Sequence, residues 1–137
     1  MMTMNFHTLL LPILLVAFGT DIANAQSEGA RDLFLENCAS CHGNSAMGDG
    51  PMADGIKGGV PDLTEIAKRN NDVFPLAETM SFIDGYIRPR THSPAMPEFG
   101  ELLSASPTVL YDTGDGILTP TPSALVALAE YLQSIQR

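Results

Sequence analysis

The sequence predicts an all-α protein of about four helices, near residues 28–41, 62–70, 76–87 and 122–136. Three of these segments carry apolar residues at the three- and four-residue spacing of an amphipathic helix. The stretches between them are rich in glycine and proline, which favour loops and turns. The length of 137 residues is enough for one domain with its own core.

The first predicted helix has one apolar stripe that includes both cysteines of the chain. Its members are spaced by three, one, four and three positions: Ala30, Leu33, Phe34, Cys38 and Cys41. The charged residues of the same segment fall outside the stripe. We therefore expect the two thiols to point the same way as the apolar side chains.

The second and third helices follow a glycine-rich segment, residues 43–59, that we interpret as a loop. Asp62 and Glu65 have the spacing of a capping box and predict a short helix through about Arg69. After Pro75, apolar residues at intervals of four, three and four predict a third helix that Pro89 ends. Its stripe consists of Leu76, Met80, Ile83 and Ile87.

Residues 88–120 contain five prolines and are predicted to be mostly loop. Two short apolar runs, residues 109–111 and 117–119, flank a turn rich in aspartate and glycine and predict a small hairpin. Thr121 is expected to cap the last helix, with Pro122 as its first helical residue. Apolar residues between positions 125 and 132 make this helix amphipathic.

Residues 1–25 have the features of a signal peptide. The apolar run at residues 9–18 is too short to cross a bilayer as a stable helix. Ala23 and Ala25 are the small residues that a signal peptidase reads, so Gln26 is expected to begin the mature chain. No lysine or arginine precedes the run, which leaves an uncleaved membrane anchor as the alternative. With cleavage, we expect an exported protein that has no membrane span.

The mature chain, residues 26–137, is acidic, since 7 basic against 15 acidic residues give a net charge of −8. This charge argues against a nucleic-acid partner, whose phosphates would be repelled. It suits a partner protein with a basic docking surface. Charge that serves solubility alone explains it equally well.

The most specific motif is Cys38-Ala39-Ser40-Cys41-His42, the attachment signature of c-type haem. On a helix, Cys38 and Cys41 lie on one face and can bond to the two vinyl groups of one porphyrin. His42 is then the proximal ligand of the iron. A thioredoxin-like dithiol lacks its strand-helix-strand context here, and a zinc site lacks further ligands. A structural helix with a disulfide is the remaining alternative.

The second axial ligand of such a haem decides whether the sixth coordination site of the iron is filled or open to a small ligand. Met96 lies between Pro94 and Pro97, which stiffen the backbone on both sides of the thioether. We favour Met96, with His92 of the same loop as the rival ligand. The remaining methionines fit less well, because they belong to the helix core or lie too close after His42: Met47, Met52 and Met80.

With these residues the chain resembles a class I, monohaem cytochrome c of the bacterial periplasmic type. Four segments carry the resemblance in the right order: residues 29–43, Val60-Pro61-Asp62-Leu63, Ala95-Met96-Pro97 and Tyr131-Leu132. The resemblance implies one domain over residues 26–137, with about four helices wrapped around one covalently attached haem. The loop 44–59 and the insertion 98–120 are longer than compact members need.

The resemblance also implies roles for single residues. The Pro61 carbonyl is expected to accept a hydrogen bond from His42, which fixes the ring and raises its basicity. An aromatic residue of the last helix is expected to cross the first helix near Phe34. Independently of the resemblance, Arg88 and Arg90 precede the segment with Met96 and could bind the haem propionates as forked donors, although two solvated surface arginines are as good an interpretation.

The function that follows is one-electron transfer between protein partners, not an enzyme activity. No acid–base pair or nucleophile implies catalysis by the protein. Two alternatives stay open. One is a haem subunit docked on a periplasmic dehydrogenase or reductase, for which the insertion 98–120 could serve. The other is a haem enzyme or gas sensor whose sixth coordination site is open.

Overall fold

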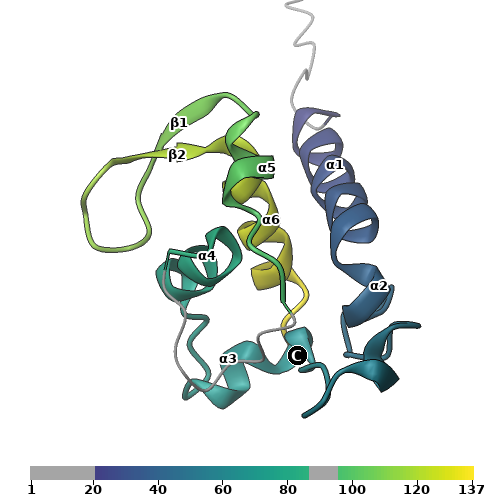
Figure 1. Cartoon of the computed structure of the whole chain (residues 1–137). Helices are drawn as coiled ribbons and strands as arrows, with labels where there is room; N and C mark the ends of the chain where they lie inside the picture. The colour runs from purple at the N-terminus through teal and green to yellow at the C-terminus, as the bar shows by residue number, and fades with distance from the viewer. Residues whose placement is uncertain (1–20, 87–95) are drawn as a thin grey trace, which may run out of the picture.

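The computed structural model describes residues 21–86 and 96–137 of the chain, with side chains from residue 28 onward. Six α-helices and two short strands make up this part (Figure 1). The helices are α1 (Asp21–Asn37), α2 (Ala39–His42), α3 (Ile66–Arg69), α4 (Leu76–Asp84), α5 (Gly100–Ser104) and α6 (Ser123–Ser134). The predicted all-α class is confirmed, since the described residues contain only one small sheet, β1 (Thr108–Tyr111) with β2 (Thr119–Pro122).

Helix α6 is the centre of the packing. It lies beside α1 on one side and beside α4 and α5 on the other (Figure 1). Its buried face consists of Leu125, Val126, Leu128, Ala129 and Leu132. Phe34 of α1 is completely buried against this face, and Met80 and Ile83 bury the facing side of α4. The apolar stripes that predicted these three helices therefore form one core.

The first helix is broken at Cys38, whereas the sequence predicted one helix over residues 28–41. Helix α1 ends at Asn37, and α2 begins again at Ala39. The Asn37 side chain donates a hydrogen bond to the Leu33 carbonyl at 2.9 Å. An asparagine side chain that bonds to the backbone in this way competes with the helical ladder. Cys38 is the N-cap residue of α2, and its carbonyl accepts a hydrogen bond from the His42 N–H at 2.9 Å.

The second and third helices are shorter than predicted. Asp62 caps a 3-10 turn (Leu63–Glu65) by accepting a hydrogen bond from the Thr64 backbone N–H at 2.8 Å, and α3 follows directly. Helix α4 ends at Asp84 instead of residue 87. Gly85 terminates it in the left-handed conformation, with φ of +95°. Ile87 and Pro89, the predicted end of this helix, lie outside the described residues.

The segment that was predicted to be mostly loop contains helix α5 and the hairpin. The second strand is Thr119–Pro122, not residues 117–119, and Tyr111 pairs with Thr119. The turn is longer than predicted because Asp112 and Asp115 bind its backbone. Asp112 Oδ1 accepts hydrogen bonds from the Gly114 and Gly116 N–H groups at 2.8 and 3.0 Å.

The predicted cap of the last helix is also wrong, because Thr121 belongs to β2 and Pro122 precedes the helix. Two N–H groups at the start of α6 bond to a distant segment. Ser123 N–H donates to the Pro107 carbonyl at 2.8 Å, and Ala124 N–H donates to Ser106 Oγ at 3.0 Å. A side chain from outside the helix thus takes the capping role.

The predicted signal-peptide boundary falls within α1, and residues 1–20 lie outside the described residues. Across the portions of the chain described, no helix has both the length and the apolar character needed to cross a membrane.

Candidate haem-binding site

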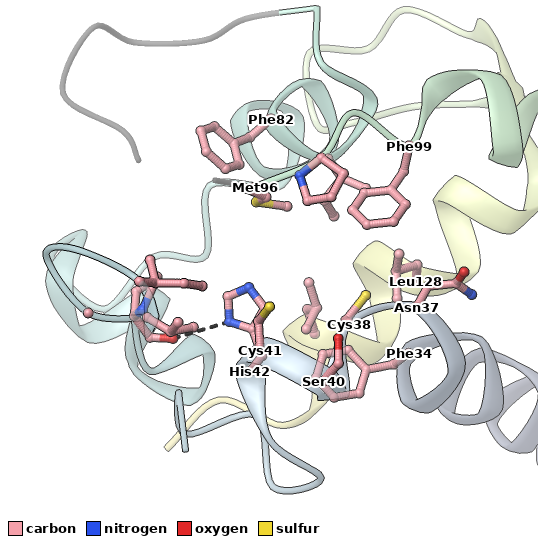
Figure 2. Close-up of a pocket in the computed structure, with 17 residues that line it drawn as sticks. Phe34, Asn37, Cys38, Ser40, Cys41, His42, Phe82, Met96, Phe99 and Leu128 are labelled. Atoms are coloured by element: carbon pink, nitrogen blue, oxygen red, sulfur yellow. Dashed lines mark hydrogen bonds between the residues drawn. The ribbon is translucent and has the colours of Figure 1, made fainter. Parts of the chain in front are cut away.

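A cleft opens between α2, the end of α4 and the segment that begins at Met96 (Figure 2). Its walls are largely apolar: Phe34, Ile56, Phe82, Ile83, Phe99, Leu128 and Leu132. A second hollow is lined in part by the same residues, among them His42, Met96 and Ile83. Such an apolar lining is typical of cofactor sites.

Both cysteines line the cleft as free thiols. The break at Cys38 and the turn of α2 place the two side chains on the same rim (Figure 2). Burial, and secondarily the neighbouring Cys41, raise the pKa of the Cys38 thiol to about 11. The attacking thiol of a redox dithiol has a lowered pKa instead. The site therefore does not fit a thioredoxin-like function.

His42 is buried at the end of α2, with its ring edge turned into the cleft (Figure 2). Its Nδ1 lies 3.3 Å from the Pro61 carbonyl oxygen. Because a carbonyl can only accept, the proton is on Nδ1, and Nε2 keeps a free lone pair. Burial lowers the pKa of His42, and the hydrogen bond to Pro61 acts in the opposite direction. The ring is thus a neutral imidazole of the kind that binds metals.

The loop after His42 folds back and supports Pro61. Gly48 N–H donates to the His42 carbonyl at 2.8 Å, and Leu63 N–H donates to the Ala46 carbonyl at 2.7 Å. Gly48 has φ of +82°, and a Cβ on it would collide with the Val60 carbonyl. Only glycine allows this close approach of two backbones. The loop and the segment 60–63 are therefore held in one fixed arrangement.

Met96 lies across the cleft from His42 (Figure 2) and is half-buried. Its segment is anchored on the end of α4, since Phe99 N–H donates to the Ile83 carbonyl at 3.1 Å. A Cβ on Gly100 would lie 2.6 Å from Asp84 Oδ1, so this approach is also tight. The cleft thus has an imidazole on one wall and a thioether on the opposite wall.

Comparison with protein families gives a match to the family model described as "Cytochrome c" over residues 27–136. The chain belongs to the cytochrome c family. Neither the curated proteins nor the solved structures gave a significant match. Membership implies a haem c that is bound covalently, and the spacing of Cys38 and Cys41 fits that attachment. It also supports a role in electron transfer.

The lining of the cleft fits a porphyrin in its chemistry. The space between the two walls is lined mostly by apolar side chains, and the two thiols that would bond to the vinyl groups line the same space. In the described part of the chain, no group of three or more His, Cys, Asp or Glu side chains could hold a metal ion together. A porphyrin that brings its own iron does not need such a group.

Five of the residues singled out from the sequence line this cleft: Cys38, Cys41, Pro61, His42 and Met96. Arg88, Arg90 and the rival ligand His92 lie outside the described residues. Met80 is buried in the core, as predicted, while Met47 and Met52 are exposed.

The sequence did not single out Phe82 and Phe99, which flank Met96 on its wall (Figure 2). The one sequence feature that could have identified them is their position, since the two aromatic residues lie on either side of the proline-rich segment that carries Met96.

Proposed function

We propose that this cytochrome c is a periplasmic one-electron carrier of the class I, monohaem type, with His42 and Met96 as the axial ligands. The observation that carries the proposal is the placement of these two side chains on opposite walls of the cleft, with both thiols on its rim. Haem iron supplies the chemistry by alternating between the ferric and ferrous states.

The residues of the chain have separate tasks in this proposal. Cys38 and Cys41 bind the porphyrin edge as thioethers. The Pro61 carbonyl orients the His42 ring and increases its basicity through the Nδ1–H bond. Met96 contributes a weak thioether ligand that favours the ferrous state and so raises the reduction potential.

Exclusion of water from the iron suits a carrier better than an enzyme. Phe82 and Phe99 stand beside Met96, and Ile83 and Leu128 complete the apolar lining. Low polarity around the iron limits the reorganisation that accompanies each electron transfer. A haem enzyme or gas sensor would need one axial position open to a small ligand.

The predicted signal peptide and the charge of the chain support a proposal for where the protein acts and which partners it meets. Export through the signal peptide at residues 1–25 would place the domain 26–137 in the periplasm. A net charge of −8 would attract redox partners with basic docking surfaces. Arg88 and Arg90 remain the proposed partners of the haem propionates.

A second candidate, a haem subunit docked on a larger redox enzyme, is favoured by one observation. The hairpin exposes large apolar side chains, with Leu110, Ile117 and Leu118 each more than 60% exposed. Clusters of exposed apolar residues often mark interaction surfaces. Both candidates transfer single electrons through the same site.

The absorption spectrum of the purified holoprotein tests the carrier proposal. The oxidised form is expected to be low-spin and to show the weak long-wavelength band of a sulfur–iron bond. Carbon monoxide should bind the reduced form only slowly. A high-spin oxidised spectrum together with rapid carbon monoxide binding would favour the sensor or enzyme function instead.

A further inference from the structure

Arg137, beyond the end of α6, reaches back to the segment that follows Pro61. Its backbone N–H donates to the Thr64 carbonyl at 3.0 Å. Its side chain makes two further bonds, from Nε to Thr64 Oγ1 at 2.7 Å and from Nη2 to Asp62 Oδ2 at 2.8 Å. The guanidinium thus bridges two side chains of this segment as a fork.

Gln136 binds the backbone of the same segment at Leu63 and Ala67. Its Nε2 donates to the Leu63 carbonyl at 2.8 Å, and its Oε1 accepts from the Ala67 N–H at 2.8 Å. The Nε2 group also donates to the Leu132 carbonyl at 2.6 Å, which ties the segment to the last turn of α6. Both the donor and the acceptor of this amide are therefore occupied.

Thr64, which is only 4% exposed, connects Asp62 and Arg137 within this network. Asp62 Oδ1 accepts from both the backbone N–H and the hydroxyl of Thr64, at 2.8 and 2.6 Å. Among the described residues, no buried side-chain nitrogen or oxygen lacks a hydrogen-bond partner. A polar network that is satisfied at every member is rigid.

This network determines the direction of the Pro61 carbonyl. Pro61 has no N–H with which it could be held itself. Its C=O lies in the same planar peptide unit as the nitrogen of Asp62. The contacts that hold Asp62 in place therefore also fix the direction of the Pro61 carbonyl oxygen. This oxygen accepts the hydrogen bond from His42 Nδ1 at 3.3 Å.

We propose that Gln136 and Arg137 are positioning residues, which hold the Pro61 carbonyl against His42 and so tune the proximal ligand of the haem iron. The inference rests on the proposed ligation of iron by His42. Without these two residues the Nδ1–H bond weakens and the imidazole becomes a poorer donor. The ferric state then loses stabilisation, and the reduction potential rises.

Simple electrostatics predicts the opposite sign, which makes the test decisive. Removal of a positive charge favours the ferric state and lowers the potential. Lys68 provides the matched control, because it lies in α3, is 64% exposed and makes a surface ion pair with Glu65 at 3.1 Å. Arg137→Ala and Lys68→Ala remove the same charge, but only the first removes the fork.

The experiment measures the reduction potential of the holoprotein and, by NMR of the ferrous form, the solvent exchange of the His42 ring N–H. We expect Arg137→Ala to raise the potential and to speed this exchange by at least about tenfold, the factor for one lost hydrogen bond. Arg137→Lys keeps the charge but not the fork and should shift both readouts in the same direction. Lys68→Ala should leave the exchange unchanged and should not raise the potential.

An unchanged or lower potential in Arg137→Ala, with unchanged ring exchange, would overturn the positioning role. If Arg137→Ala does not accumulate as holoprotein, Gln136→Ala is measured in the same way and decides. The wild-type protein tests the underlying ligation separately. If the wild type shows the signals of an iron-bound histidine but the variants change neither the potential nor the ring exchange, the positioning role is rejected and the ligation by His42 stands.

Discussion

The rings of Phe34 in α1 and Tyr131 in α6 lie in contact, with centroids 5.5 Å apart and planes tilted by 48°. This geometry is a favourable arrangement for two aromatic rings. Phe34 is completely buried and also lines the haem cleft. The contact between the first and the last helix is therefore also a wall of the cofactor site, so helix packing and the haem environment depend on the same residue.

Phe34→Ala should lower the free energy of unfolding by about 3–5 kcal/mol, because it removes a large side chain from a packed core and leaves a cavity. Denaturant unfolding of the holoprotein measures this. Tyr86→Ala is the control, since Tyr86 is 85% exposed, and should change stability by no more than about 0.5 kcal/mol. Equal losses in the two variants would contradict the assigned packing.

Gly48→Ala should destabilise the protein by at least about 2 kcal/mol. The new Cβ meets the Val60 carbonyl, and the φ of +82° is strained for any L-residue. The variant should also disturb the bond between Pro61 and His42. Gly55→Ala is the matched control in the same loop, because nothing lies within 4 Å of its added Cβ. Thermal unfolding of both variants checks the difference, and equal melting temperatures would be incompatible with the close approach at Gly48.

Asp62 should make stability depend on acid pH. Its pKa is lowered, first by the hydrogen bond from the Thr64 hydroxyl and further by Arg137. A carboxylate with a lowered pKa stabilises the fold above its unfolded pKa, about 3.9. That contribution is lost as the pH falls through the lower, folded value. Urea unfolding between neutral pH and about pH 3 should therefore show a shallower acid loss in Asp62→Asn than in the wild type. A parallel decline in both proteins would reject this role.

The sequence predicted the packed helices well because their signals are local and periodic. The stripes of α4 and α6 could be read directly, and the motif at Cys38, Cys41 and His42 is specific by spacing alone. The segment with Met96 was identified as a candidate ligand loop from its flanking prolines.

The features that were missed depend on side chains that bond to the backbone or on contacts between distant segments. The Asn37 side chain bonds to the Leu33 carbonyl beside the break at Cys38, and Asp112 binds the backbone of the long hairpin turn, but neither bond leaves a periodic signal. Helix α5 has no apolar stripe long enough to identify in a five-residue segment. The segment of Phe99 is tied to α4 by the bond from the Phe99 N–H to the Ile83 carbonyl, a contact between distant positions of the chain.

Met96 is proposed to fill the coordination site of the iron opposite His42. The oxidised spectrum of Met96→Ala, compared with that of Met52→Ala, tests this ligation, because Met52 is 61% exposed and does not line the cleft. We predict that Met96→Ala loses the sulfur–iron band, binds carbon monoxide rapidly in its reduced form and has a lower potential, while Met52→Ala keeps all three wild-type properties. A band that persists in Met96→Ala, or a wild type without the band that turns high-spin on His92→Ala, would contradict the account.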